Sequence, residues 1–113
     1  MKVTVVLIFS LISLNILSEE YLCSIVLSED VEMEIKTYER IGSVFRKTSL
    51  YGESVFQIRK ETEEFIILNK TYNYPDIYTV FLDKKNKNIV EDYIVFEDHM
   101  TTTRTSGKCL IKN

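Results

Sequence analysis

The carboxylates near the only histidine come closer to a catalytic arrangement than any other residues in this sequence. His99 follows Glu97 and Asp98, and a second acidic pair, Glu91 and Asp92, lies a few residues earlier. A histidine can serve as a general base or metal ligand, and two carboxyl groups can hydrolyse a glycosidic bond, if they converge on one point. Neighbouring residues of a strand point to opposite faces, so neither acidic pair converges by itself. The serines lack a nucleophile-elbow motif. We therefore expect no enzymatic activity, no metal site and no cofactor.

The two cysteines favour a crosslink over a reactive or metal-binding site. Cys23 and Cys109 lie far apart in the chain, and no other cysteine is present. An even number of cysteines in an exported chain favours a disulfide, whereas a structural zinc site needs four ligands. In the chain-entropy model, a bond that closes so long a loop stabilises the fold by about 4–5 kcal/mol. We expect this bond within one chain; a bond between two chains is the alternative.

Tyrosines give the sequence its best candidate for a recognition surface. Tyr72 and Tyr74 stand in an irregular stretch before the only proline, and Tyr38 and Tyr51 occur earlier in the chain. Tyrosine is enriched at protein interfaces, where its ring supplies apolar area and its hydroxyl supplies hydrogen bonds. These four residues form the predicted interface. The alternative is that their rings cover the rim of the core.

The elements that must position these residues are strands. The chain contains no alanine, the best helix former, and it is rich in Val, Ile, Thr, Tyr and Phe, which favour strands. Runs of these residues recur every 8–12 positions between short polar turns, which is typical of an antiparallel meander. The strands are expected at 21–27, 31–41, 43–49, 54–60, 64–69, 76–83, 89–97 and 101–111. The predicted fold is all-β, closed as a small barrel or packed as a two-sheet sandwich.

The alternation of apolar and polar residues predicts which side chains face the interior. In the second expected strand Val31, Met33 and Ile35 alternate with charged residues, so we expect the apolar set inside and Glu34 and Lys36 in solvent. In a barrel of this size side chains can fill the interior, or they can leave room for one small ligand. The residues expected to line the interior are Met33, Ile35, Phe45, Phe56, Ile58, Phe65, Ile67, Val80, Leu82, Val95 and Phe96.

The first 18 residues have the order of a secretory signal peptide. Lys2 gives a basic start, an apolar run follows over 3–17, and the small Ser18 precedes an acidic pair. The apolar run is short for a bilayer span of about 20 residues; an uncleaved membrane anchor is the alternative. Cleavage leaves a single extracellular domain, residues 19–113. In such a chain the sequon that begins at Asn69 predicts glycosylation.

The charge of the chain argues against two classes of partner. The net charge is −3 at pH 7, and acidic and basic residues are interspersed. Nucleic-acid binding requires a clustered basic surface, and an anionic membrane attracts basic segments. We expect a secreted monomer that, after loss of its signal peptide, binds neither nucleic acid nor membrane.

A short segment resembles the lipocalins. Residues 91–96, from Glu91 to Phe96, are similar to the T-D-Y-x-x-Y/F segment that precedes the penultimate strand of the lipocalin barrel, and Arg104 loosely matches the arginine under its floor. Glu91 replaces the threonine, the G-x-W motif is absent, and no segment remains for the C-terminal helix. The resemblance implies an eight-stranded barrel that captures a small apolar or amine ligand without catalysis.

Two functions are therefore expected for this chain. The first is a secreted, non-enzymatic binding protein that recognises another protein through its surface loops. The second is a lipocalin-like carrier that sequesters a small apolar or amine ligand in a barrel cavity. A continuous internal cavity of about 300 Å³ or more would favour the carrier, and a filled core would favour surface recognition.

Overall fold

The computed structural model describes residues 19–26, 33–71 and 75–112. The predicted signal peptide and two residues of the predicted interface, Tyr72 and Tyr74, lie outside the described residues. The described residues form eight strands, and no helix among them is long and apolar enough to cross a membrane. In chain order the strands are β1 (Glu20–Val26), β2 (Met33–Ile41), β3 (Val44–Ser49), β4 (Gly52–Glu61), β5 (Phe65–Thr71), β6 (Ile77–Asp83), β7 (Asn88–Phe96) and β8 (Met100–Lys112).

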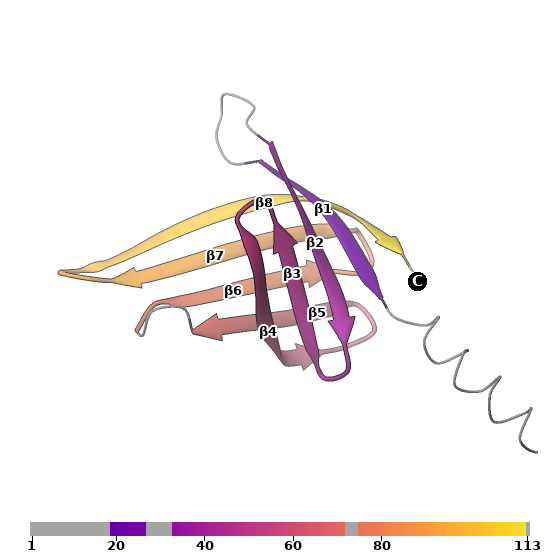
Figure 1. The fold of residues 1–113 in the computed structure, drawn as a ribbon, viewed down its shortest axis with the longest axis horizontal. Helices are drawn as coiled ribbons and strands as arrows, with labels where there is room; N and C mark the ends of the chain where they lie inside the picture. Colours follow the sequence, from indigo (N-terminus) through magenta and orange to yellow (C-terminus); the bar gives the residue numbers. More distant parts are fainter. Residues whose placement is uncertain (1–18, 27–32, 72–74, 113) are drawn as a thin grey trace, which may run out of the picture.

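The strands form a closed meander. Each strand pairs antiparallel with the next one in the chain, and β1 also pairs with β8, so the sheet closes into a barrel (Figure 1). The all-β prediction is confirmed, and of the two architectures that the sequence left open the chain forms the barrel. Closure pairs the strand edges that an open sheet would expose.

The seam between β1 and β8 is the place where the barrel closes. Cys23 and Cys109 lie directly opposite each other there and form the disulfide, which confirms the predicted pairing. Two residues earlier on β8, Gly107 lies opposite Ile25. A Cβ atom at Gly107 would lie 2.0 Å from the carbonyl oxygen of Ser24, so only glycine allows this close approach.

The strand β2 has its faces reversed relative to the sequence prediction. Met33 and Ile35 point outward and are 58% and 56% exposed, whereas Glu34 and Lys36 are buried in the barrel. The period of two was predicted correctly and its phase was wrong. The reason is that the polar side chains find partners inside the barrel, so the usual rule that apolar residues face inward fails here.

The rest of the interior is mostly apolar and well filled. Of the residues predicted to line it, Phe45, Phe56, Val80 and Leu82 are in the core and Ile58 packs against it. Phe96 is exposed, and Phe65 and Ile67 alternate with buried residues of β5, so they lie on the outer face of the sheet. The buried core comprises Tyr21, Cys23, Ile25, Tyr38, Phe45, Phe56, Ile66, Leu68, Val80, Leu82, Ile89 and Cys109.

The hairpin of β7 and β8 extends beyond the barrel. The two strands pair as far as Phe96 and Met100, but β1 pairs with β8 only from Ser106 onward. Figure 1 shows the hairpin reaching well past the other strands. His99 lies at its tip, away from the barrel interior.

Candidate functional site

The residues first considered for catalysis do not converge. His99 and the two carboxylates before it are exposed in the turn between β7 and β8. Glu91 points into the barrel, whereas Asp92 points outward and accepts hydrogen bonds of 2.6 and 2.8 Å from Arg104. Arg104 is exposed on β8, and its match with the lipocalin arginine stays an expectation from the sequence. Within residues 19–26, 33–71 and 75–112, no group of three or more His, Cys, Asp or Glu side chains is placed to hold a metal ion.

The fold places the two described tyrosines of the predicted interface in different environments. Tyr51 is 88% exposed at the tip of the β3–β4 turn, as a recognition residue would be. Tyr38 is fully buried and donates its hydroxyl hydrogen to Glu91 inside the barrel, so its assignment to a surface is wrong. The period of two in β2 places Tyr38 on the same face as Lys36, and that face is the interior.

The predicted glycosylation residue lies within a strand. We expected Asn69 at the start of a loop, but β5 continues through Lys70 and Thr71, which pair with Tyr78 and Ile77 of β6. Asn69 is half-buried, on the face of β5 opposite to the core residue Leu68. Glycosylation at Asn69 stays a prediction.

A charged cluster lies inside one end of the barrel, beside the β3–β4 turn. We call this cluster the polar mouth; its members are Glu34, Lys36, Lys47, Tyr78 and Glu91. They come from four strands: β2, β3, β6 and β7. Buried charges are costly unless they are paired or bonded, so their arrangement determines whether this end of the barrel is stable.

Glu91 is the best-bonded member of the polar mouth. Its side chain is 2% exposed, and Oε1 accepts hydrogen bonds from Lys36 Nζ at 2.8 Å and from the Thr105 hydroxyl at 3.3 Å. Its other oxygen accepts a hydrogen bond from the Tyr38 hydroxyl. Burial, reinforced by the charge of Glu91, raises the pKa of Tyr38 well above its usual value, so the phenol stays protonated as the donor.

Two lysines share one phenol in the polar mouth. Lys36 Nζ and Lys47 Nζ each lie 3.3 Å from the hydroxyl oxygen of Tyr78. Lys36 is neutralised by Glu91, and Glu34 lies 3.8 Å away on its other side. In the described part of the chain no carboxylate forms an ion pair with Lys47. The two ammonium groups therefore differ in one respect: only Lys36 has a counter-ion.

The environment of Lys47 disfavours its charge. The nitrogen lies 4.4 Å from the ring centre of Tyr78 and 5.9 Å from that of Phe56, and these cation–π contacts by themselves favour the ammonium ion. Burial, followed by repulsion from Lys36, lowers the pKa of Lys47 from 10.5 to about 8. At mildly alkaline pH, Lys47 is consequently a neutral amine in a substantial fraction of the molecules.

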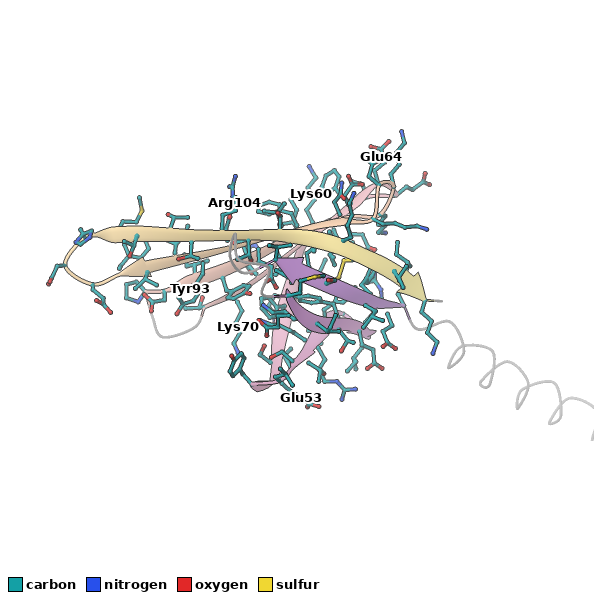
Figure 2. All side chains as sticks on the ribbon, turned by 90° about the horizontal axis from the view of Figure 1, so that it is seen from above. Glu53, Lys60, Glu64, Lys70, Tyr93 and Arg104 are labelled. Atoms are coloured by element: carbon teal, nitrogen blue, oxygen red, sulfur yellow. A yellow bond between two sulfur atoms is a disulfide. The ribbon has the colours of Figure 1, made fainter. Side chains whose placement is uncertain are left out.

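A cavity of about 380 Å³ adjoins the polar mouth and opens to solvent at the end of the barrel. Its wall combines the polar mouth with aromatic rings and with the hydroxyl groups of the β3–β4 hairpin. Ligand sites typically combine apolar surface with a few convergent polar groups in this way. Figure 2 shows Glu53, from the β3–β4 turn, on the opposite side of the molecule from Glu64. The lining residues are Glu34, Lys36, Lys47, Ser49, Tyr51, Gly52, Glu53, Ser54, Phe56, Tyr78 and Tyr93.

The opposite end of the barrel is closed by a second charged cluster. We call this cluster the closed end; its members are Glu19, Tyr21, Arg40, Glu61 and Lys84. Glu61 accepts hydrogen bonds from Arg40 and, at 2.9 Å, from Lys84, while the Tyr21 hydroxyl donates to Glu19 at 2.6 Å. Burial alone would raise the pKa of Glu61, but the bonds from Lys84 and Arg40 outweigh it and lower that pKa.

A second hollow lies on the outer face of the sheet. Ile67, Phe81 and Val90 lie opposite one another on β5, β6 and β7, and Phe65 continues the same face. The hollow has a volume of about 630 Å³ and is open to solvent. We call it the outer groove. Charged and amide side chains from the adjoining turns, among them Asp83, Lys85 and Asn86, line one end of it, so apolar contact there is bordered by polar groups.

Sequence reasoning missed Lys36, Lys47 and Glu34 as site residues. Each is a charged residue within a strand, and charged residues in strands usually face solvent. Lys36 and Glu91 are 55 residues apart in the chain, and only the closed barrel brings them together. One signal was available: Lys47 lies two residues after Phe45, which was predicted to face the core, so the period of two also directs Lys47 inward.

Comparisons of this chain with family models, with curated proteins and with solved structures find no match. The lipocalin resemblance therefore stays an expectation from the sequence. The polar mouth is interpreted below from its own geometry.

Proposed function

We propose that this chain is a secreted, non-enzymatic binding protein whose barrel end holds a small molecule at the polar mouth. One observation carries the proposal: a buried, mutually bonded charged cluster adjoins a cavity of about 380 Å³. Buried ionic groups are seldom the most stabilising choice for a core, since apolar residues of similar volume often stabilise a fold as well. Charges retained beside a cavity suit the recognition of a ligand.

The cavity walls support a ligand of mixed character. The rings of Phe56, Tyr78 and Tyr93 supply apolar surface, and the polar mouth supplies donors and acceptors at its inner end. A small molecule with a short apolar body and one polar head would match both. This resembles the carrier function in ligand size, but the cavity of about 380 Å³ is open at the end of the barrel and is not the continuous internal cavity expected of a lipocalin-like carrier.

Two neighbouring residues of β4 give a matched pair of variants for a test. Ser54 lines the cavity, and Val55 next to it is 50% exposed on the outer face. We expect Ser54→Phe to fill the cavity and abolish binding, and Val55→Phe to preserve it. The probes are benzyl alcohol, hexanol, benzoate and benzylamine, measured by calorimetry and by the shift of the melting temperature. Binding by none of the four, or equal binding to both variants, would contradict the proposal.

Export is the second part of the proposal. The disulfide between Cys23 and Cys109 is consistent with an oxidising compartment, where such bonds persist. Expression in a secreting host should release a chain that lacks residues 1–18 and contains no free thiol. N-terminal sequencing and thiol titration would test this, and retention of residues 1–18 would contradict it.

Recognition of another protein is the second candidate function. The outer groove favours it, because Ile67, Phe81 and Val90 form contiguous apolar surface on the outside of the sheet. Exposed Tyr51 adds a contact residue at the other end of the molecule. If a protein partner is found, Phe81→Ser should weaken its binding by about tenfold or more, and Val55→Ser should not. Equal binding by both variants would exclude the outer groove.

A further inference from the structure

The polar mouth contains two carboxylates and two lysines, but both of its ion pairs are made by Lys36. Lys36 and Glu91 alone form a satisfied buried pair, which Tyr38 and Thr105 complete. Lys47 adds a second ammonium group, 3.3 Å from the same Tyr78 hydroxyl that Lys36 contacts. A lysine that only stabilised the barrel would be expected to have a counter-ion, and the residues that the structure describes supply none.

The surroundings of Lys47 are those of an amine nucleophile. Burial of Lys47 and the charge of Lys36 both disfavour protonation and lower its pKa to about 8. Lys36 has a different environment, because it forms a 2.8 Å ion pair with Glu91. Glu34 acts on both lysines from β2 and moderates the effect without a direct bond to Lys47.

The cavity gives a ligand access to the nitrogen of Lys47. Lys47, Tyr78 and Phe56 all line it, so a molecule bound there would lie against both the amine and the phenol. Burial and the charge of Glu91 raise the pKa of Tyr78, so its hydroxyl keeps its hydrogen and can exchange a proton with a reacting group.

We propose that Lys47 captures small aldehydes in this cavity by forming a reversible imine with them. This proposal names a ligand class for the binding function proposed above, and it rests on that function. The lone pair of the neutral Nζ attacks the carbonyl carbon, and the carbonyl oxygen takes up a proton. The nitrogen loses a proton, and the hydroxyl group of the resulting carbinolamine leaves as water when the C=N bond forms. The net change is amine plus aldehyde to imine plus water, with no oxidation or reduction. Tyr78 is a positioning residue that exchanges protons with the carbinolamine oxygen.

Reductive trapping tests this proposal on the full, disulfide-bonded chain. Benzaldehyde at pH 7.5 with sodium cyanoborohydride converts an imine to a stable benzylamine, which peptide mass mapping locates. We expect Lys47 to be labelled at least about tenfold faster than Lys60, an exposed residue of β4, because its neutral fraction is far larger. Figure 2 shows Lys60 on the side of the molecule opposite to Glu53 of the cavity.

Matched variants separate a specific site from general lysine chemistry. Lys47→Arg should lose the fast adduct, and Lys60→Arg should retain it. If Lys47→Arg fails to fold, Ser54→Phe serves instead: it leaves Lys47 in place but fills the cavity, so labelling of Lys47 should fall to the rate of Lys60. Val55→Phe should leave the fast labelling unchanged. Equal labelling of Lys47 and Lys60 in the wild-type chain would overturn the proposal.

The non-carbonyl probes keep this inference distinct from the proposed function. If benzyl alcohol or benzoate binds the cavity while benzaldehyde labels all lysines alike, the barrel is a binding protein and the imine is refuted. Preferred binding of benzoate in that case assigns Lys47 as the counter-ion of a carboxylate. If no probe binds and Lys47 is not labelled selectively, both the imine and the proposed function fail.

Discussion

The two ends of the barrel use the same kinds of side chain in different ways. At the closed end Arg40 and Lys84 both bond to Glu61, and these groups remain partly in contact with water. In the polar mouth Glu34, Lys36 and Glu91 are almost completely buried, and the partly buried Lys47 has no carboxylate partner among the described residues. The closed end is thus organised as a cap over the core, and the polar mouth has the organisation of a site that a ligand completes.

Removal of the central carboxylate should show the largest difference between the two ends. Glu91→Gln leaves the charge of Lys36 buried without a counter-ion, and we expect it to lower the free energy of unfolding by about 3–5 kcal/mol. Urea denaturation would measure this loss. The double variant Lys36→Met, Glu91→Leu removes both charges and should be more stable than Glu91→Gln; a double variant that is less stable would contradict the account of this pair.

The protonation of Lys47 should make the stability of the barrel depend on pH. Its pKa is about 8 in the folded chain and near 10.5 when unfolded, so the unfolded chain binds more protons between these values and stability rises with pH. Lys36, Glu34, Glu91 and Tyr78 are the ionisable groups that face it in the polar mouth. Because Lys47 is only partly buried, the expected gain is about 1–2 kcal/mol.

Denaturation at pH 7, 8 and 9 would measure this gain in stability below the range in which the phenols of the unfolded chain ionise. Lys47→Met should abolish the rise. A wild-type chain whose stability does not rise over this interval would show that the pKa of Lys47 is not lowered.

The smallest effect is expected at the closed end. Glu61→Gln should cost about 0–1 kcal/mol at pH 7, because the ion pairs of Glu61 with Arg40 and Lys84 are about a quarter exposed to solvent. The folded pKa of Glu61 is lowered, so its contribution is present above about pH 4.5 and is lost as the pH falls further. Acid titration of the wild-type chain and of Glu61→Gln, followed by circular dichroism, would compare the pH at which each one unfolds. A loss as large as that of Glu91→Gln would remove the distinction between the two ends.

The fold was more predictable than the site because the two depend on different information. The strands follow from local composition and turns, and the pairing of Cys23 with Cys109 follows from there being only two cysteines. The phase of β2 could not be predicted, because Lys36 is stabilised inside by Glu91, a partner that lies far away in sequence. The alternation within a strand shows which residues are apolar. It does not show which polar residues will find a partner on the other side of a barrel.

The tyrosines show the same limit. Tyr38 and Tyr51 were equivalent by residue type, yet one bonds to Glu91 in the core and the other lies at an exposed turn. A tyrosine can satisfy either environment, because its ring is apolar and its hydroxyl needs one partner. Only the register of each strand determines which environment it meets.

Chemical-shift mapping is the most direct test of the claim that the polar mouth is the binding site. Benzyl alcohol would be titrated into the isotopically labelled chain, and the perturbed amide signals would be assigned to residues. We predict that the largest changes occur around Lys47, Ser54 and Tyr78, at the cavity. Changes centred on Phe81 and Val90 of the outer groove, or no saturable change anywhere, would contradict the account.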